Sequence, residues 1–206
     1  MTDPGRQAHW DNVYATKNEK DVSWYQDRAT PSLELIALTA VSADAEIIDI
    51  GGGASRLVDS LLLANLGQVT VLDLSGAALD AARQRLGDKA ACVKWLVADV
   101  TAWEPSQTYD LWHDRAAFHF LTDLADQSAY AERLKRAVKP NGFVIIGTFA
   151  PDGPERCSGL PIVRHDAAAL AALLGDGFEL IDARRHEHTT PWGAAQRFQF
   201  ATFRRH

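Results

Sequence analysis

The sequence predicts an α/β fold in which helices cover both faces of a mostly parallel sheet that ends in an antiparallel strand pair. Three observations support this prediction. From Ile47 onward, short apolar runs alternate with helix-like segments, as in strands that are joined by crossover helices. The first four of these runs are continuously apolar at their centres, as expected for strands covered on both faces. Two strand-like segments, 178–188 and 194–203, then follow each other with only a turn between them.

The composition is that of one ordinary globular domain. The 206 residues are 47% hydrophobic and 23% charged, so the chain can bury a full core without a disulfide or a metal. Acidic residues number 27 and basic residues 21, and the resulting net charge of −6 disfavours nucleic-acid binding. The sequence has no signal-peptide pattern and no run of about 18 apolar residues that a membrane span needs. We therefore expect one domain over residues 1–206, located in the cytoplasm, with no nucleic-acid or membrane partner.

The first part of the chain combines aromatic and polar residues. Residues 9–26 contain Trp10, Tyr14, Trp24 and Tyr25 in an otherwise mostly polar segment. Because so much ring surface should be buried rather than left in water, we expect this segment to cover one edge of the sheet. A helix is predicted next, over residues 31–41, with its apolar residues on one side.

The elements of the sheet region follow in order. Ser75 suits the N-cap of a helix that Gly87 ends, and the turn 139–142 separates a later helix from the fifth strand. A turn at 191–193 joins the closing antiparallel pair. We predict parallel strands at 46–50, 69–73, 93–98, 109–113 and 143–149, and helices at 55–66, 75–86, 130–138 and 166–174.

The first predicted strand leads into three consecutive glycines. Gly51, Gly52 and Gly53 follow Asp49-Ile50 and precede a helix, so backbone amides can approach a ligand at the carboxyl edge of the sheet. The arrangement indicates a nucleotide-like cofactor. Arg56 stands where the dinucleotide fingerprint needs its third glycine, which disfavours a NAD-type site, and no Walker sequence is present.

Two further strands end in carboxylates. Asp73 closes the second strand, where it can accept hydrogen bonds from both hydroxyl groups of a ribose. Asp99 closes the third strand and is placed to accept a hydrogen bond from the exocyclic amine of a purine; its alternative role is to begin a turn. Since carboxyl ends of parallel strands share one edge, these acids and the glycines predict one nucleoside site.

The segments Asp49-Ile50-Gly51-Gly52-Gly53, Asp73 and Ala98-Asp99-Val100 resemble the signatures of class I S-adenosylmethionine-dependent methyltransferases. The turn 139–142 is similar to that family's Pro-Gly-Gly turn, with Asn141 replacing a glycine. The resemblance implies a Rossmann-like fold with a seven-stranded, mostly parallel sheet, S-adenosyl-L-methionine as the cofactor, and methyl transfer as the activity. It also implies that Asp49 meets the methionyl ammonium, the alternative being a cap of the following helix.

A narrower resemblance involves two short segments. Trp10-Asp11-Asn12-Val13-Tyr14 and Trp112-His113-Asp114-Arg115-Ala116 are similar to the thiopurine methyltransferase-like and lysine methyltransferase groups, although His113 stands where a tryptophan is more usual. The resemblance implies that residues 1–45 form a cofactor-covering segment and helix. It also implies that Arg115 faces the cofactor or substrate pocket; the alternative is an ion pair with Asp114 or Asp123.

The candidate site residues fall into three groups. His113 or His119 could remove a proton from the acceptor, although a local hydrogen-bonding role is the alternative for each. Residues 157–165 are expected to form a substrate-side loop or else a surface connection, and neither Cys157 nor Cys92 has the spacing of a metal ligand, so no metal site is expected. The predicted cofactor-binding residues are Trp10, Tyr14, Trp24, Asp49, Gly51, Gly52, Gly53, Asp73, Leu74, Asp99, Val100 and Arg115.

The activity expected from the sequence is methyl transfer to a small-molecule or protein nucleophile. Such an enzyme must mainly orient the acceptor, exclude water and remove a proton where needed. Aromatic rings such as Trp24 and Tyr25 would stabilise the sulfonium. The alternatives are a protein lysine methyltransferase, with an acid-rimmed peptide groove, a NAD-dependent reductase, and a noncatalytic nucleoside-binding protein. An enclosed apolar cavity would favour a small acceptor.

Overall fold

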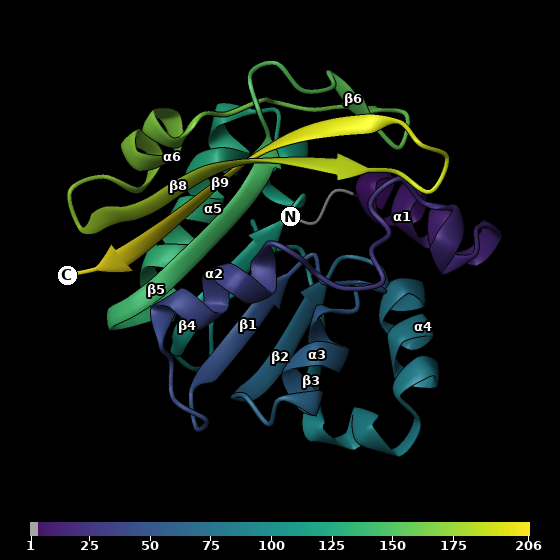
Figure 1. The fold of residues 1–206 in the computed structure, drawn as a ribbon, viewed down its shortest axis with the longest axis horizontal. Helices are drawn as coiled ribbons and strands as arrows, with labels where there is room; N and C mark the ends of the chain where they lie inside the picture. Colours follow the sequence, from purple (N-terminus) through teal and green to yellow (C-terminus); the bar gives the residue numbers. More distant parts are fainter. Residues whose placement is uncertain (1–3) are drawn as a thin grey trace.

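The computed structural model describes residues 4–206; the first three residues of the predicted domain lie outside this range. Figure 1 shows the arrangement of the elements. The helices are α1 Pro4–Thr16, α2 Ser32–Thr39, α3 Leu57–Leu63, α4 Gly76–Leu86, α5 Leu124–Ala137 and α6 Ala167–Leu174, with short 3-10 turns η1 Glu19–Asp21, η2 Gly87–Cys92 and η3 Phe118–Phe120. The strands are β1 Glu46–Ile50, β2 Gln68–Asp73, β3 Val93–Val97, β4 Tyr109–Arg115, β5 Val138–Phe149, β6 Arg156–Cys157, β7 Leu160–Pro161, β8 Phe178–Thr189 and β9 Ala195–Arg205.

Seven of the described strands form the central sheet, in the order β3-β2-β1-β4-β5-β9-β8. Strands β1 to β5 are parallel, while β9 pairs antiparallel with both β5 and β8. The predicted fold class is therefore confirmed, including the antiparallel pair at the C-terminal end. A separate hairpin of β6 and β7, which was not predicted, follows β5.

Apolar side chains cover both faces of this sheet. On one face, Ile47 belongs to a cluster that includes Leu35 of α2 and Leu61 of α3. On the other face, Ile48 belongs to a second cluster to which α5 and α6 contribute. Neighbouring residues of β1 thus point to opposite faces and are both fully buried, which explains why the strand reads as continuously apolar.

Several predicted element ends are confirmed. At the start of α4, the Ser75 hydroxyl accepts a hydrogen bond from the backbone N–H of Ala78 at 3.2 Å. Helix α4 ends at Leu86, and Gly87 follows with a φ of +57°. Asp166 caps α6 in the same way, since its carboxylate accepts from the Ala169 N–H at 2.8 Å. Helices α4 and α6 therefore begin where a short polar side chain satisfies a free N–H group.

Other predicted boundaries were wrong. Helix α5 begins at Leu124 rather than at residue 130, and Leu124 itself is 79% exposed, so its first turn shows no apolar face. The predicted turn 139–142 is an irregular part of β5: Tyr109 pairs with Val138 and Leu111 pairs with Phe143, so β5 contains extra residues there. Helix α3 is shorter than predicted, ending before Asn65, whose φ is +50°.

The N-terminal aromatic segment contains a helix that was not predicted. Helix α1 packs against α4, and the Ser75 hydroxyl donates a hydrogen bond to the Asp11 carboxylate at 2.6 Å. Figure 1 shows α1 beside α4, at the end of the sheet where the parallel strands finish. The segment thus covers one edge of the sheet, as its ring content predicts.

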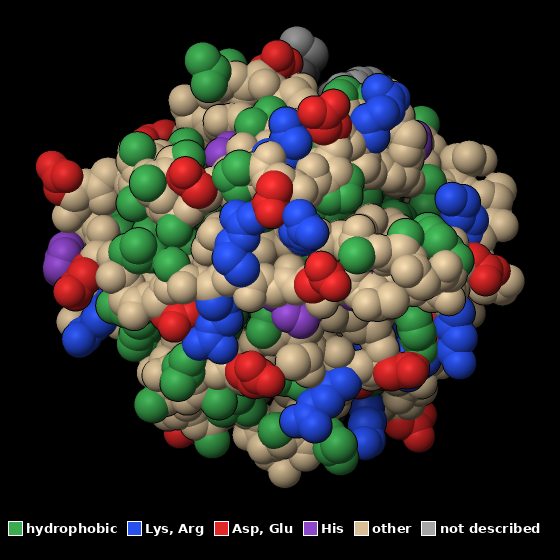
Figure 2. All heavy atoms as spheres, turned by 45° about the horizontal axis from the view of Figure 1, so that its top comes forward, with side chains coloured by type: hydrophobic (Ala, Val, Ile, Leu, Met, Phe, Trp, Pro, Cys, Tyr) green, Lys and Arg blue, Asp and Glu red, His purple; other side chains and the backbone are tan. Residues whose placement is uncertain are grey.

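Charged side chains on the surface are mixed in sign. Figure 2 shows acidic and basic groups interspersed on one face of the molecule. Asp152, for example, lies between Arg185 and Arg197, and Arg184 forms ion pairs with Asp182 and Glu34. None of the helices within residues 4–206 has the length and apolar character needed to cross a membrane.

Candidate functional site

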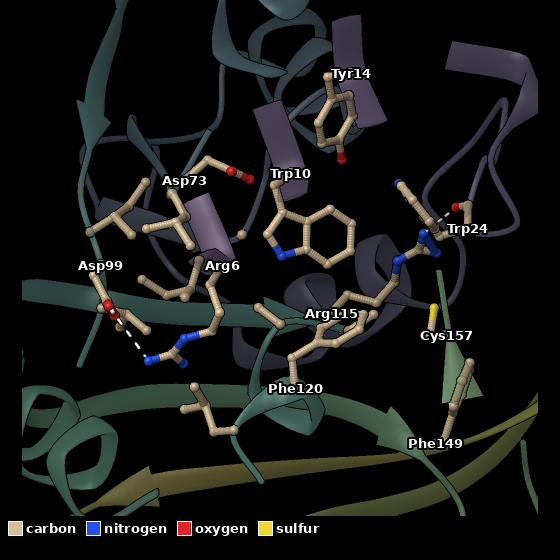
Figure 3. A pocket seen from close by; sticks show the side chains of 18 of the residues that line it. Arg6, Trp10, Tyr14, Trp24, Asp73, Asp99, Arg115, Phe120, Phe149 and Cys157 are labelled. Carbon is tan, nitrogen blue, oxygen red and sulfur yellow. Dashed lines mark hydrogen bonds and ion pairs between the residues drawn. The ribbon is translucent and has the colours of Figure 1, made fainter. Parts of the chain in front are cut away.

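An open cavity lies at the carboxyl ends of the parallel strands. It contains about 890 Å³ of empty space, including solvent at its mouth. Figure 3 shows Asp73 and Asp99 on one side, Phe149 and Cys157 on the other, and Trp10 between them. The cavity is lined by Arg6, Trp10, Tyr14, Trp24, Ile50, Gly51, Leu72, Asp73, Leu74, Ala98, Asp99, Val100, Arg115, Ala116, Ala117, Phe120, Leu121, Phe149, Cys157, Gln196 and Phe198.

The glycine loop after β1 is closely packed. Gly51 has a φ of +63°, and a Cβ added to it would lie only 2.5 Å from the Cβ of Ala117. A Cβ on Gly53 would lie 2.9 Å from Oδ2 of Asp73 and 3.0 Å from the Tyr14 hydroxyl. Both positions therefore need glycine, because a side chain would displace groups that form the cavity.

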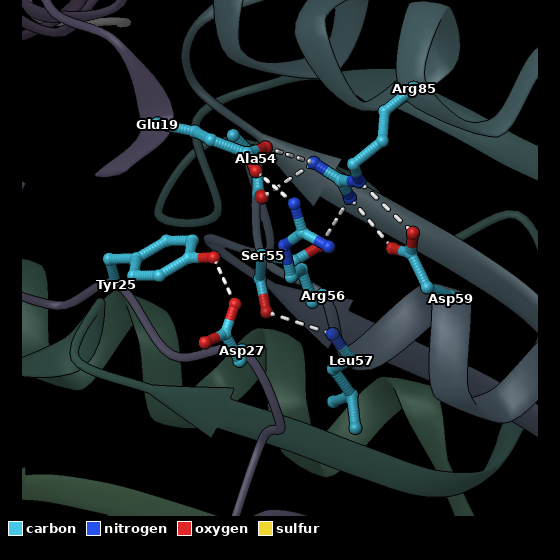
Figure 4. Close-up of polar contacts among 9 residues, drawn as sticks. All are labelled: Glu19, Tyr25, Asp27, Ala54, Ser55, Arg56, Leu57, Asp59 and Arg85. Atoms are coloured by element: carbon cyan, nitrogen blue, oxygen red, sulfur yellow. Dashed lines mark hydrogen bonds and ion pairs between the residues drawn. The ribbon is translucent and has the colours of Figure 1, made fainter. Parts of the chain in front are cut away.

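Arg85 of α4 holds the backbone that follows these glycines. Its guanidinium donates hydrogen bonds to the carbonyl oxygens of Ala54 at 2.9 Å and Ser55 at 2.8 Å. It also pairs with the carboxylates of Asp59 and Glu19, at 2.7 and 3.0 Å. Figure 4 shows how this one side chain connects the glycine loop, α3 and the N-terminal segment.

Asp73 faces the cavity from the end of β2. Its side chain is buried and accepts a hydrogen bond from the backbone N–H of Ser75 at 2.8 Å. Burial, together with the nearby Asp49 carboxylate, raises the pKa of Asp73 to about 7. Without a bound partner, this carboxyl group thus changes charge near neutral pH.

Asp99 offers a second carboxylate to the same cavity. Its Oδ1 accepts hydrogen bonds from the N–H and the hydroxyl of Thr101, at 2.9 and 2.7 Å. Its Oδ2 is buried and, among residues 4–206, has no hydrogen-bond partner, although an Arg6 nitrogen lies 3.7 Å away. A turn-capping role therefore uses only one oxygen and leaves the other for a donor in the cavity.

Aromatic rings form the cover of the cavity. Arg6, Trp10 and Tyr14 recur at intervals of four residues, which places them on one face of α1. The Trp10 ring centroid lies 4.9 Å from that of Phe120 and 5.7 Å from that of Trp24. Burial raises the pKa of Tyr14, so this hydroxyl stays neutral. Tyr25 does not line this cavity; its ring lies near Lys20 and Arg56 instead.

Arg115 brings a positive charge to the cavity wall. Its guanidinium donates hydrogen bonds to the Gln26 side chain and to the Trp24 carbonyl, not to the carboxylates of Asp114 or Asp123. Desolvation lowers the pKa of Arg115 to about 10, which still leaves it charged at neutral pH. The contacts connect the end of β4 to the N-terminal cover.

Asp114 fixes the loop that continues from Arg115. It accepts hydrogen bonds from the Ala117 N–H at 3.0 Å and from the Tyr130 hydroxyl at 2.8 Å, and Trp112 donates to the same hydroxyl. Burial raises the pKa of Asp114 to about 6. This buried group shapes the cavity wall at Ala116 and Ala117 without facing the cavity itself.

The two predicted bases lie behind the wall. His113 Nδ1 is 2.7 Å from Asp49 Oδ1 and its Nε2 is 2.8 Å from the Ser32 hydroxyl, so both ring nitrogens are engaged. His119 is fully buried, and its Nδ1 accepts a 3.4 Å hydrogen bond from the Phe149 N–H. Desolvation and the charges of His165 and Arg115 lower the pKa of His119 to about 3. Neither imidazole lines the cavity, and a catalytic role for either stays a prediction.

The structure brings most of the predicted cofactor-binding residues together. Asp49, Gly52 and Gly53 lie next to the cavity without lining it. Arg6 was missed, although its spacing from Trp10 and Tyr14 is a helical signal. Cavity residues supplied by distant elements, which no local pattern marks, were also missed; they include Phe120, Phe149, Gln196 and Phe198. The predicted cofactor-binding residues that line the cavity are Trp10, Tyr14, Trp24, Gly51, Asp73, Leu74, Asp99, Val100 and Arg115.

Comparisons with known proteins find methyltransferases. Residues 47–142 match the family described as "Methyltransferase domain". Trans-aconitate 2-methyltransferase of Paracidovorax citrulli is 29% identical over 123 residues, which is 58% of this chain and 45% of that protein. Nodulation protein S of Rhizobium tropici is 26% identical over 104 residues, covering 50% of this chain and 43% of that protein. The chain thus matches about half the length of these curated relatives.

Solved structures share the fold over nearly the whole chain. N-methyltransferase NodS from Bradyrhizobium japonicum, in complex with S-adenosyl-L-homocysteine, has a TM-score of 0.73 at 17% identity and covers 98% of this chain, with 99% of its own chain matched. The 1,6-didemethyltoxoflavin-N1-methyltransferase of Burkholderia thailandensis has a TM-score of 0.72 at 22% identity, with coverages of 100% and 91%. Residues 47–142 thus match a methyltransferase domain, and the whole chain shares the fold of solved methyltransferases.

Proposed function

We propose that this protein binds S-adenosyl-L-methionine in the cavity and transfers its methyl group to a small-molecule acceptor. One observation carries the proposal: Gly51, Asp73 and Asp99 line one cavity at the ends of three adjacent strands. In this order they match a methionyl chain, a ribose and an adenine. The match of residues 47–142 to a methyltransferase domain supports the same assignment.

The donor and acceptor groups fit that cofactor. The Asp73 carboxylate suits two ribose hydroxyl groups, and Oδ2 of Asp99, which accepts no hydrogen bond from residues 4–206, suits an exocyclic amine. The close approach of Gly51 to Ala117 leaves room for backbone, not for a side chain, beside the ligand. Since the family binds a sulfonium and the wall contains several rings, cation–π contacts would add about 0.5–2 kcal/mol of binding.

The chemistry supplied by the bound cofactor is an electrophilic methyl group on a sulfonium. The residues of this chain position the acceptor and exclude water from the reaction. Trp10, Trp24 and Phe120 form the apolar cover, while Arg85 and Asp114 hold the loops that shape the walls. We propose no base from His113, because its ring nitrogens are hydrogen-bonded to Asp49 and Ser32.

The other half of the cavity favours a small, uncharged acceptor over a lysine side chain. Phe149 lies on the other side of Trp10 from Asp73 and Asp99, which are the carboxylates among the described lining residues. The ring of Phe198, which also lines the cavity, contacts that of Phe149. The charged guanidinium of Arg115 would repel an ammonium group. The described residues of this half therefore do not form the acid-rimmed groove that would suit a lysine-bearing peptide.

Calorimetry tests the cofactor assignment and the main alternatives. We expect S-adenosyl-L-methionine and S-adenosyl-L-homocysteine to bind, and NADH to bind far more weakly or not at all. Preferential binding of NADH would support a reductase and contradict the proposal. Asp73→Ala should weaken S-adenosyl-L-homocysteine binding by about tenfold or more, because the ribose loses a charged hydrogen-bond acceptor.

Methyl transfer from labelled cofactor tests the acceptor class. The purified protein would be incubated with a panel of thiols, amines, phenols and carboxylates, and separately with protein and small-molecule fractions of a cell lysate. Label in small molecules would support the proposal. Label confined to protein bands would favour a protein methyltransferase, whereas tight cofactor binding without any transfer would favour a noncatalytic binding protein.

A further inference from the structure

Among the described residues, no donor pairs with a buried amide oxygen in the wall of the cavity. Gln196, at the start of β9, lines the cavity and is only 9% exposed. Its Oε1 is buried and makes no hydrogen bond to any residue in the range 4–206. Leaving such an oxygen without a donor is unfavourable, so an unpaired amide in a cavity wall points to a bound molecule that supplies one.

The cofactor does not account for this oxygen. Asp99 follows β3, and five steps along the strand order separate β3 from β9. Because neighbouring strands in a sheet are side by side, these five steps place Gln196 and Asp99 at opposite ends of the cavity. The groups that match the adenine and the ribose, Asp99 and Asp73, are on the other side of Trp10 from Phe149. Gln196 therefore belongs to the acceptor half.

The surroundings of Gln196 limit what the acceptor can be. Phe198 lines the same wall two residues further along β9, and its ring centroid is 4.8 Å from that of Phe149 at an interplanar angle of 69°. Rings in such arrangements offer flat apolar faces to a ligand. Cys157 lines the same cavity; burial raises its pKa to about 11, so it stays a neutral thiol. Arg115, which also lines the cavity, has its guanidinium hydrogen-bonded to Gln26 and to the Trp24 carbonyl.

We propose that Gln196 is a specificity-determining residue that accepts a hydrogen bond from an N–H or O–H group of a small aromatic acceptor. The inference rests on the proposed function and adds the chemical class of the acceptor to it. The aromatic walls bind the body of the molecule, and the amide oxygen selects a donor on its rim. An aromatic molecule of the same size without that donor leaves the oxygen unpaired and binds less tightly.

The experiment uses matched aromatic probes that differ in one donor. Calorimetry on the protein saturated with S-adenosyl-L-homocysteine would compare phenol with anisole, and benzimidazole with 1-methylbenzimidazole. We expect the donor-bearing member of a pair to bind about fivefold more tightly or better. Gln196→Leu should reduce that preference to less than twofold while it keeps the binding of S-adenosyl-L-homocysteine unchanged.

The matched control is Gln68→Leu, which makes the same change at an exposed position at the start of β2. This variant should keep the full preference. Equal affinities within both pairs, no binding of either pair, or a preference that survives Gln196→Leu would overturn the proposal. Binding of S-adenosyl-L-homocysteine alone is measured first: its absence in the native protein would contradict the proposed function itself, whereas its presence with no donor preference would contradict only the role of Gln196.

Discussion

The Asp73 carboxyl group is expected to make cofactor binding depend on pH. Its pKa is raised to about 7 by burial, and hydroxyl groups of a ribose donate better to the ionised form. With that pKa, the ionised fraction rises from about one-tenth at pH 6 to about nine-tenths at pH 8. We therefore predict that the affinity for S-adenosyl-L-homocysteine increases about tenfold over this range, as measured by calorimetry.

Asp73→Asn is the matched variant for this prediction. It retains the shape of the side chain but cannot ionise, so its affinity should be lower at pH 8 and should change little between pH 6 and pH 8. A native protein whose affinity is constant across the range would show that Asp73 is already ionised before binding, or that the ribose lies elsewhere.

Arg85 is expected to act on the cofactor site through the backbone it holds. Its hydrogen bonds to the Ala54 and Ser55 carbonyls fix the chain just after the glycine loop. We predict that Arg85→Met weakens S-adenosyl-L-homocysteine binding by about tenfold, since hydrogen bonds from charged groups are among the stronger ones. Arg83→Met, on the same helix but with a 39% exposed side chain, should leave the affinity unchanged.

The effect of Arg85→Met on fold stability can be separated from its effect on ligand binding. If Arg85 only stabilised the fold, Arg85→Met would lower the melting temperature but bind the cofactor product with native affinity once folded. That outcome would contradict the positioning role.

The sequence predicts candidate site residues only where they belong to a local motif at the end of a strand. The glycines directly follow β1 and Asp73 is the last residue of β2, so their placement follows from neighbours in the chain. Arg85 and Gln196 carry no such signal. Their roles depend on the packing of α4 against the glycine loop and of β9 against β5, which one sequence does not reveal.

At the scale of elements, α1 and the segment after it are expected to respond to the cofactor. Trp10 and Tyr14 of α1 line the cavity, while Lys17 and Lys20 are exposed in the segment that follows α1. We predict that S-adenosyl-L-homocysteine slows tryptic cleavage after these two lysines, because the bound molecule adds contacts that keep the segment in place.

Cleavage after Lys89 provides an internal reference. Lys89 is exposed in η2 and does not line the cavity, so its rate of cleavage should be unchanged by the ligand. Equal rates with and without ligand at Lys17 and Lys20 would show that the segment does not act as a cover. The measurement is the time course of fragments by mass spectrometry.

Element boundaries were predictable where capping side chains mark them. Ser75 and Asp166 have side-chain oxygens that bind free helix N–H groups, and both helix starts were predicted. The start of α5 was missed, because Asp123 makes no side-chain cap and Leu124 is exposed. The irregular part of β5 was missed because extra residues within a strand look like a turn in sequence.

For the whole molecule, the cofactor site should contribute to stability when it is filled. At a ligand concentration 100 times the dissociation constant, binding adds about 2.7 kcal/mol to the free energy of unfolding. For a domain of this size, each kcal/mol added to the free energy of unfolding raises the melting temperature by about 2–4 °C. We therefore predict that S-adenosyl-L-homocysteine raises the melting temperature by about 5–11 °C.

The same melting experiment discriminates between ligand classes. NADH at equal concentration should produce no comparable increase, and Asp73→Ala, which binds about tenfold more weakly, should lose about half of the increase caused by S-adenosyl-L-homocysteine. A larger effect of NADH would contradict the methyltransferase proposal. The readout is differential scanning calorimetry of the native protein and the variant.

The fold class of the whole molecule was predictable, but the order of its strands was not. Alternating apolar runs and helices imply a parallel sheet because each crossover must be covered by a helix. The position of β4 next to β1, and of β9 between β5 and β8, depends on contacts between distant segments. The cavity follows from that order, since it unites residues from α1, five parallel strand ends and β9.

The placement of β9 has a consequence for how the protein becomes functional during synthesis. The wall next to Phe149 is completed by Gln196 and Phe198, which pair into the sheet only after β9 has emerged. A nascent chain that has produced β1 to β5 already has every strand end of the nucleoside-binding half. It lacks the wall that we propose binds the acceptor until β9 is added, so under this proposal we expect the two binding halves to form at different moments of translation.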